Sequence, residues 1–152
     1  MKRLILFLVV LSAIIPASLY ASGGGSEGFS QRESAPNLQE IKKTIDEKKY
    51  PEAVKMLKKY IQTDPGSADA YTYLGFSYRK SGHLPEAFKA YDKALALDPK
   101  HLGAHEYLGE AYLMNKEPEK AKATLNRLQG MCGNCEESRD LEKAISADQH
   151  KK

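Results

Sequence analysis

The sequence repeats itself at one fixed offset, which is the separation between Tyr71 and His105 along the chain. Large and small apolar residues of a middle stretch have counterparts that far along the chain. The middle stretch carries Tyr71, Leu74, Gly75, Tyr78, Ala87, Tyr91, Ala94 and Pro99, and the later one carries His105, Leu108, Gly109, Tyr112, Ala121, Leu125 and Leu128. An earlier third copy is indicated because Pro51-Glu52-Ala53 and Asp64-Pro65 recur as Pro85-Glu86-Ala87 and Asp98-Pro99. This period predicts stacked copies of one small unit rather than a single irregular core.

The spacing within the middle copy predicts a pair of short helices. Apolar residues recur at helical intervals over residues 70–80 and again over 85–97, with a Ser-Gly turn between them. Pro85 falls in the first turn of the second helix, where a missing N–H costs little, and Pro99 ends that helix. Gly75 is expected to permit close helix packing, because a lone helical glycine otherwise costs about 1 kcal/mol relative to alanine.

The apolar signature of the middle copy resembles that of the tetratricopeptide repeat. The resemblance implies an all-α fold, in which helix-turn-helix repeats over residues 34–67, 68–101 and 102–135 form a short right-handed α-solenoid. A capping helix is predicted over 136–147, because a stack of helix pairs would otherwise expose an apolar end. The third copy departs from the signature at His105, and the first copy matches it only in its second helix. This fold hosts many unrelated binding functions, so the resemblance implies protein binding and no enzymatic activity.

Both ends of the chain differ from the repeats. A short basic start and an apolar run over residues 4–15 predict a signal peptide over 1–23, since the run is shorter than the roughly 20 residues that span a bilayer. An uncleaved membrane anchor is the alternative. A flexible Gly/Ser-rich linker is expected over 24–36, and a disordered tail over 148–152. The leader predicts an exported protein, most consistently one of the bacterial periplasm.

Charge and motif patterns exclude several function classes. Cleavage of the leader leaves 21 basic and 20 acidic side chains, which gives no concentrated basic field for nucleic acid, and no membrane contact is expected after cleavage. His101 is placed in a turn and His105 in a packed core position, and Gly109 replaces the second histidine of a zinc-protease motif. No metal and no cofactor are therefore expected.

Cys132 and Cys135 are the two cysteines of the chain. An exported protein meets an oxidising compartment, so a disulfide between them is predicted, and it would fix how the capping helix docks. Thiol–disulfide exchange is the alternative, because Cys135 would lie near a helix start, where a thiolate is favoured.

The family resemblance implies that the first helix of each pair lines a concave groove. Phe76, flanked by Arg79 and Lys80, is predicted either to anchor an apolar, partly acidic partner segment or to pack within the stack. Register places the following residues on the groove side: Leu38, Lys42, Ile45 and Asp46 from the first copy, Asp69, Thr72, Tyr73, Phe76, Arg79 and Lys80 from the second, and Glu106, Glu110, Leu113 and Met114 from the third.

The sequence thus predicts a periplasmic adaptor or scaffold that binds a peptide or helix of another protein. The carboxylate clamp that cytosolic heat-shock chaperone tails occupy in this family is not expected, since its positions here hold Leu38, Lys42, Tyr73, Gly103 and Tyr107. Two alternatives remain open: a thiol exchanger that uses the cysteine pair, and a scaffold whose stacks join end to end as a homo-oligomer.

Overall fold

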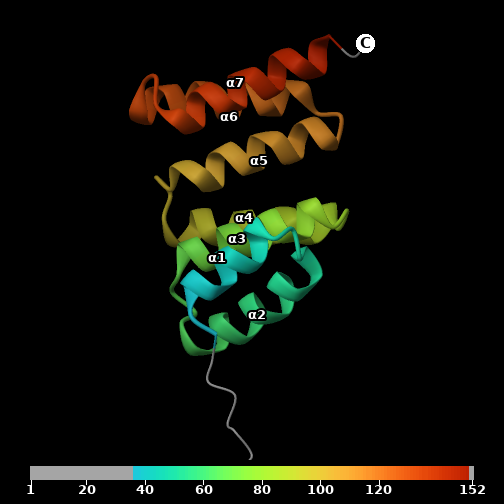
Figure 1. The fold of residues 1–152 in the computed structure, drawn as a ribbon. Helices are drawn as coiled ribbons and strands as arrows, with labels where there is room; N and C mark the ends of the chain where they lie inside the picture. Colours follow the sequence, from blue (N-terminus) through green and yellow to red (C-terminus); the bar gives the residue numbers. More distant parts are fainter. Residues whose placement is uncertain (1–35, 151–152) are drawn as a thin grey trace, which may run out of the picture. The chain divides into compact units, whose positions relative to one another are not determined.

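The computed structural model describes residues 36–150, which form seven helices and, within that range, no strand. The predicted leader and nearly all of the linker lie outside the described residues. Figure 1 shows the helices in chain order. They are α1 (Leu38–Asp46), α2 (Tyr50–Thr63), α3 (Ala68–Lys80), α4 (Leu84–Leu97), α5 (Leu102–Met114), α6 (Pro118–Cys132) and α7 (Glu136–Gln149).

The two helices of each pair begin in different ways. Side chains cap the first helices: Asn37 accepts from the Glu40 N–H at 2.9 Å, and Ser67 accepts from the Ala70 N–H at 3.2 Å. The second helices α2, α4 and α6 have no side-chain cap and instead carry a proline in the first turn. Because a proline offers no N–H, it removes one of the unsatisfied donors of a helix start.

The turn inside each pair has the same backbone conformation in all three copies. Lys48, Gly82 and Lys116 occupy equivalent positions, each one repeat period after the last, and have φ values of 59°, 80° and 60°. This left-handed region is readily accessible to glycine and costs other residues about 1–2 kcal/mol. The repeat geometry is therefore imposed on two lysines, and the middle copy alone has the residue that suits it.

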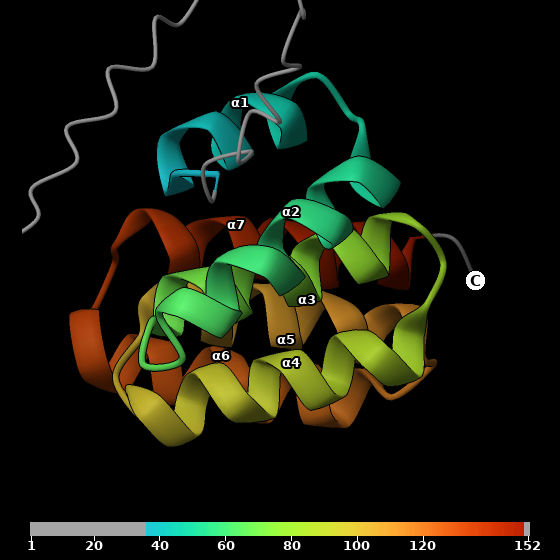
Figure 2. The same cartoon turned by 90° about the horizontal axis from the view of Figure 1, so that it is seen from below.

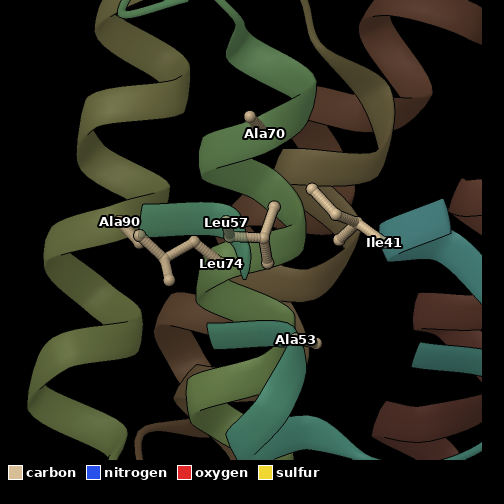
Figure 3. Close-up of a cluster of buried hydrophobic side chains, with 6 residues drawn as sticks. All are labelled: Ile41, Ala53, Leu57, Ala70, Leu74 and Ala90. Atoms are coloured by element: carbon tan, nitrogen blue, oxygen red, sulfur yellow. The ribbon is translucent and has the colours of Figure 1, made fainter. Parts of the chain in front are cut away.

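The hydrophobic core runs through the repeats. The cluster drawn in Figure 3 joins the first pair to the second and consists of Ile41, Ala53, Leu57, Ala70, Leu74 and Ala90. A second cluster, around Tyr91 and Leu108, joins the second pair to the third, and a third, around Leu128 and Leu141, joins the third pair to α7. Every junction buries apolar surface, which is what stabilises a stack of repeats.

Two glycines allow close packing of the first helices. A Cβ at Gly75 would overlap the ring of Tyr91 on α4, and a Cβ at Gly109 would overlap the side chain of Leu141 on α7. The expectation that Gly75 permits close helix packing is confirmed.

The C-terminal helix is longer than predicted. Helix α7 continues to Gln149, so Asp148 and Gln149, which were expected to lie in a disordered tail, are helical. The structure places His105 in the core at 2% exposure, where its Nε2 lies 3.0 Å from the carbonyl oxygen of Pro99. None of the seven described helices is long and apolar enough to cross a membrane.

Candidate functional site

The first helices share one side of the structure, which we call the groove surface. The backbone of α3 lies close to those of α1 and α5, and that of α5 lies close to that of α7, whereas no Cα atoms of α2, α4 and α6 come within 8 Å of one another. Figure 2 shows α1 and α7 on the side opposite α4 and α6. The first helices therefore lie closer together than the second helices do, as on the inner side of a curved stack.

Half-buried aromatic rings form the centre of the groove surface. The ring of Phe76 lies 4.9 Å from that of Tyr107 on α5 and 6.1 Å from that of Tyr50 on α2, measured between centroids. Tyr73 carries the ammonium of Lys42 over its ring at 5.8 Å. Phe76 thus packs against rings of neighbouring helices and still keeps part of its own ring exposed.

Arg79 is buried, contrary to the sequence expectation that the groove exposes it. It is only 4% exposed and forms an ion pair with Glu110 of α5. Its guanidinium lies 5.3 Å from the centroid of the Phe76 ring and 5.8 Å from that of Tyr107, and its Nε lies 3.4 Å from the hydroxyl oxygen of Tyr91. A buried charge is tolerated where it is paired in this way. Arg79 therefore holds together side chains of α3, α4 and α5 beneath the groove surface.

Thr72 is the second groove residue whose expected exposure is wrong. It is 2% exposed, and its hydroxyl donates to the carbonyl oxygen of Ala68 at 2.9 Å. Neighbouring groove positions are accessible. Asp69 and Lys80 are exposed, Met114 is 52% exposed, and Leu113 is half-buried.

A recess of about 360 Å³ opens between α3, α5 and α7, and we call it the acidic recess. Two tyrosines, a histidine, a glycine and Thr72 line it together with five carboxylates. The full set is Asp69, Thr72, Tyr73, His101, Gly103, Glu106, Tyr107, Glu136, Glu137 and Asp140. Only some of these residues were predicted to face the groove.

His101 connects the recess to the start of α5. Its Nδ1 accepts from the Ala104 N–H at 3.1 Å, which leaves the proton on Nε2, and Nε2 donates to Asp69 at 2.9 Å. His101 therefore caps α5 and at the same time orients a carboxylate of α3. Its expected position in a turn agrees with this role.

Glu106 is the carboxylate most affected by its surroundings. Burial first, and then the nearby carboxylates of Glu110, Asp140 and Glu137, raise the pKa of Glu106 to about 7, against a smaller opposing effect of Arg79. Burial, followed by the charge of Glu106, also raises the pKa of Tyr107 to about 12. Carboxyl groups are therefore concentrated where water is partly excluded, and this position disfavours the charged form of Glu106.

Helix α7 contributes groove residues that the sequence analysis missed. Glu136, Glu137 and Asp140 line the acidic recess, and Ala144 and Ala147 line a second recess beside Leu113 and Met114. The only sequence indication is positional, since α7 begins at Glu136, one full period after the start of α5 at Leu102. Helix α7 thus occupies the register of the first helix of a fourth unit.

At the opposite end of the groove surface, α1 contributes less than expected. Leu38 and Ile45 pack against the first core cluster, while Lys42 and Asp46 are exposed. The basic groove side chains that remain accessible are thus Lys42 on α1 and Lys80 at the end of α3. The ammonium of Lys42 lies 5.8 Å from the centroid of Tyr73, a ring that lines the acidic recess.

The cysteines lie at the junction of α6 and α7. Cys132 is the last residue of α6, Cys135 precedes the first residue of α7, and a disulfide joins them. Within the described residues, no group of three or more His, Cys, Asp or Glu side chains is arranged to hold a metal ion.

The fold and the groove surface define an all-α protein built from helix-pair repeats. Two family models, both described as tetratricopeptide repeat, match residues 45–101 and 78–145. Residues 45–145 therefore belong to the tetratricopeptide repeat family, as the sequence resemblance predicted. No curated protein matches the sequence.

Solved structures with the same fold include several peptide complexes. The TPR2B domain of yeast Sti1 in a pHsp70 complex is 23% identical, with a TM-score of 0.66 over 75% of this chain and 94% of that one. The first TPR of Spaghetti (RPAP3), bound to an HSP90 peptide, is 22% identical, with a TM-score of 0.65 over 74% and 89%. The Yersinia enterocolitica secretion chaperone SycD with a YopD peptide is 20% identical, with a TM-score of 0.62 over 73% and 85%. At these identities the likeness shows a shared fold.

Proposed function

We propose that this protein is an exported adaptor that binds a segment of a partner protein on its groove surface. Tetratricopeptide repeat domains are protein-interaction modules, and the three neighbours described above are complexes with other proteins' segments. The leader-like residues 1–23 support export, and the periplasm is the compartment that we propose. The proposed role is binding rather than catalysis.

The observation that carries this proposal is the partly exposed ring pair at the centre of the groove surface. Phe76 and Tyr107 lie 4.9 Å apart on adjacent first helices, and both remain accessible. Aromatic side chains placed centrally in this way supply large contact area at low entropic cost, and they dominate binding energy in many interfaces. A bound segment would cover them.

The test is affinity capture with the tagged full-length chain, followed by identification of the retained protein and measurement of its affinity. Phe76→Ala/Tyr107→Ala should abolish retention. The matched control is Phe88→Ala/Tyr112→Ala, which removes a ring pair of the same composition, 5.2 Å apart, from α4 and α5. Circular dichroism would show that both variants keep their helices. Equal loss of binding in both variants would contradict a role of the groove surface.

Export is tested separately by the mass of the protein recovered from the cell envelope. Cleavage after Ala21 or Gly23 is expected, because these small residues follow the apolar run. Recovery of the uncleaved chain in the membrane fraction would instead support the anchor alternative.

A further inference from the structure

The five carboxylates of the acidic recess are only partly balanced by basic side chains. Asp69 is bonded to His101 at 2.9 Å, and Asp140 is paired with Lys143 at 2.8 Å. For Glu106, Glu136 and Glu137, no cationic side chain among the described residues lies within ion-pair distance. The buried guanidinium of Arg79 forms its ion pair with Glu110 instead. The recess therefore carries more negative charge than its own surroundings neutralise.

The positive ends of helices stabilise only some of these carboxylates. The positive ends of α3 and α7 stabilise Asp69, Glu136 and Glu137, which lie in or beside the first turns. Glu106 and Asp140 each lie one turn further into their helices, where this stabilisation has faded. The raised pKa of Glu106 shows that its charged form is disfavoured by burial and by its acidic neighbours. An incoming cation would relieve this cost.

The aromatic rings of the recess are a second, independent feature that favours a cation. Tyr73 and Tyr107 line the same space as the carboxylates. Both rings already have cations of this chain beside them, with Lys42 5.8 Å from the centroid of Tyr73 and Arg79 5.8 Å from that of Tyr107. Tyrosine faces and carboxylates together bind an arginine or lysine side chain more strongly than either group alone.

We propose that the acidic recess receives a lysine or arginine side chain of the partner segment, while a neighbouring apolar side chain of that segment packs on Phe76. This inference rests on the proposed function, since it specifies the chemistry of the segment that the groove binds. It reverses the expectation of a partly acidic segment, which depended on an exposed Arg79. Because Arg79 is buried and paired, the accessible charged side chains that line the recess beside Tyr107 on α5 are carboxylates, apart from the imidazole of His101.

The experiment uses a library of short random peptides displayed on phage and selected against the full-length protein. Selected peptides should be enriched in lysine or arginine next to an apolar residue. The selected peptide is then synthesised with a fluorescent label, beside a version in which glutamine replaces its basic residues. Fluorescence anisotropy should show at least about tenfold weaker binding for the glutamine version, equivalent to about 1.4 kcal/mol.

Variants of the protein locate the effect. Glu106→Gln/Glu137→Gln/Asp140→Asn should weaken binding of the basic peptide at least about tenfold and leave the glutamine version unaffected. The matched control, Glu52→Gln/Glu86→Gln/Glu142→Gln, removes the same number of exposed carboxylates outside the groove surface and should change the affinity little. Equal weakening by both triple variants would overturn the proposal, because it would show an effect of net charge alone.

The remaining outcomes separate this inference from the proposed function. Selection of acidic or uncharged peptides that still require Phe76 and Tyr107 would overturn the inference and leave the groove as a binding site. Selection of no peptide that requires this ring pair would overturn both. The protein could instead self-associate in a concentration-dependent way that is lost when Lys151 and Lys152 are removed. This result would show that the C-terminus of a second copy occupies the recess, and it would overturn the proposal that another protein does so.

Discussion

The middle and third repeats place a glycine at the same position and fill the space above it differently. Over Gly75 lies the ring of Tyr91, which comes from the second helix of the same repeat. Over Gly109 lies Leu141, which comes from α7. The residue equivalent to Tyr91 in the third repeat is Leu125, whose side chain is shorter. The equivalent glycines thus serve different contacts. Gly75 packs the two helices of one repeat together, and Gly109 packs its repeat against α7.

This difference gives α7 a larger role than that of a polar cover. Helix α7 packs more extensively on α5 than α5 does on α3. The position equivalent to buried Thr72 in the third repeat is Glu106, whose carboxyl group faces the acidic residues of α7. Close docking of α7 therefore places Glu136, Glu137 and Asp140 beside Glu106, which completes the acidic recess.

The largest expected loss of unfolding free energy follows from a change in the middle repeat, where Tyr91 covers Gly75. Tyr91→Ala removes a fully buried ring, and large-to-small changes of aromatic core residues cost about 3–5 kcal/mol of unfolding free energy. Urea denaturation followed by circular dichroism measures this loss. Leu97→Ala, on the same helix at 38% exposure, is the control and should cost far less. Similar losses for both would show that the Gly75–Tyr91 packing is not critical.

Leu141→Ala tests the junction between the third repeat and α7. Leu141 is fully buried, so its truncation is expected to cost about 2–5 kcal/mol. Because stability in repeat proteins is local, hydrogen exchange should increase in α7 and the end of α6 while α3 and α4 keep their protection. Uniform loss of protection across all seven helices would contradict a separable junction.

Removal of the disulfide should have a smaller effect on the same junction. Cys132→Ser/Cys135→Ser opens a short loop, for which the chain-entropy treatment gives about 2 kcal/mol. Increased hydrogen exchange confined to the α6–α7 turn is expected, since Leu141 still holds α7 in place. Full release of α7 would show that the disulfide, rather than the Gly109–Leu141 packing, fixes this helix.

The two glycines should respond unequally to alanine. Gly75→Ala forces a methyl group against the Tyr91 ring, and overpacking of about 1–3 kcal/mol exceeds the gain of about 1 kcal/mol in helix propensity. Gly109→Ala should be closer to neutral, because the Leu141 side chain can move to another rotamer. Both are measured by urea denaturation. Gly75→Ala/Tyr91→Leu copies the smaller residue of the third repeat and should restore part of the loss. Equal losses of unfolding free energy for Gly75→Ala and Gly109→Ala would contradict the proposed difference in packing at the two glycines.

The last prediction concerns the pH dependence of stability contributed by Glu106, whose size is reduced because solvent screens this half-buried side chain. Its pKa is raised to about 7 in the folded state from an ordinary 4.5, so the folded state holds the proton more tightly. Stability should therefore fall as the pH rises from about 5 to about 8. Glu106→Gln should flatten this part of the pH profile of urea midpoints, whereas exposed Glu142→Gln should not. An unchanged slope in Glu106→Gln would show that burial does not perturb this carboxyl group.

The sequence by itself determined the all-α repeat fold. Its constant repeat period, the prolines at the starts of the second helices and the close packing at Gly75 follow from short-range geometry, which recurs from copy to copy. The same reasoning placed Phe76, Tyr73 and Met114 on the groove side, where the structure finds them at least partly accessible. Helix α7 begins one period after α5, but Arg139, Glu142, Lys143 and Ser146 stand at the signature positions, so the apolar pattern did not reveal its register.

Only the tertiary structure decided which groove residues are accessible and what charge they present. Arg79 is buried because Glu110, which lies on the next first helix, pairs with it beneath two aromatic rings. The acidic recess exists because docking of α7 brings Glu137 and Asp140 beside Glu106. These contacts join residues that are about one repeat apart in the sequence. The electrostatic effect of each contact depends on the distance between the groups and on their burial, and a sequence pattern specifies neither quantity.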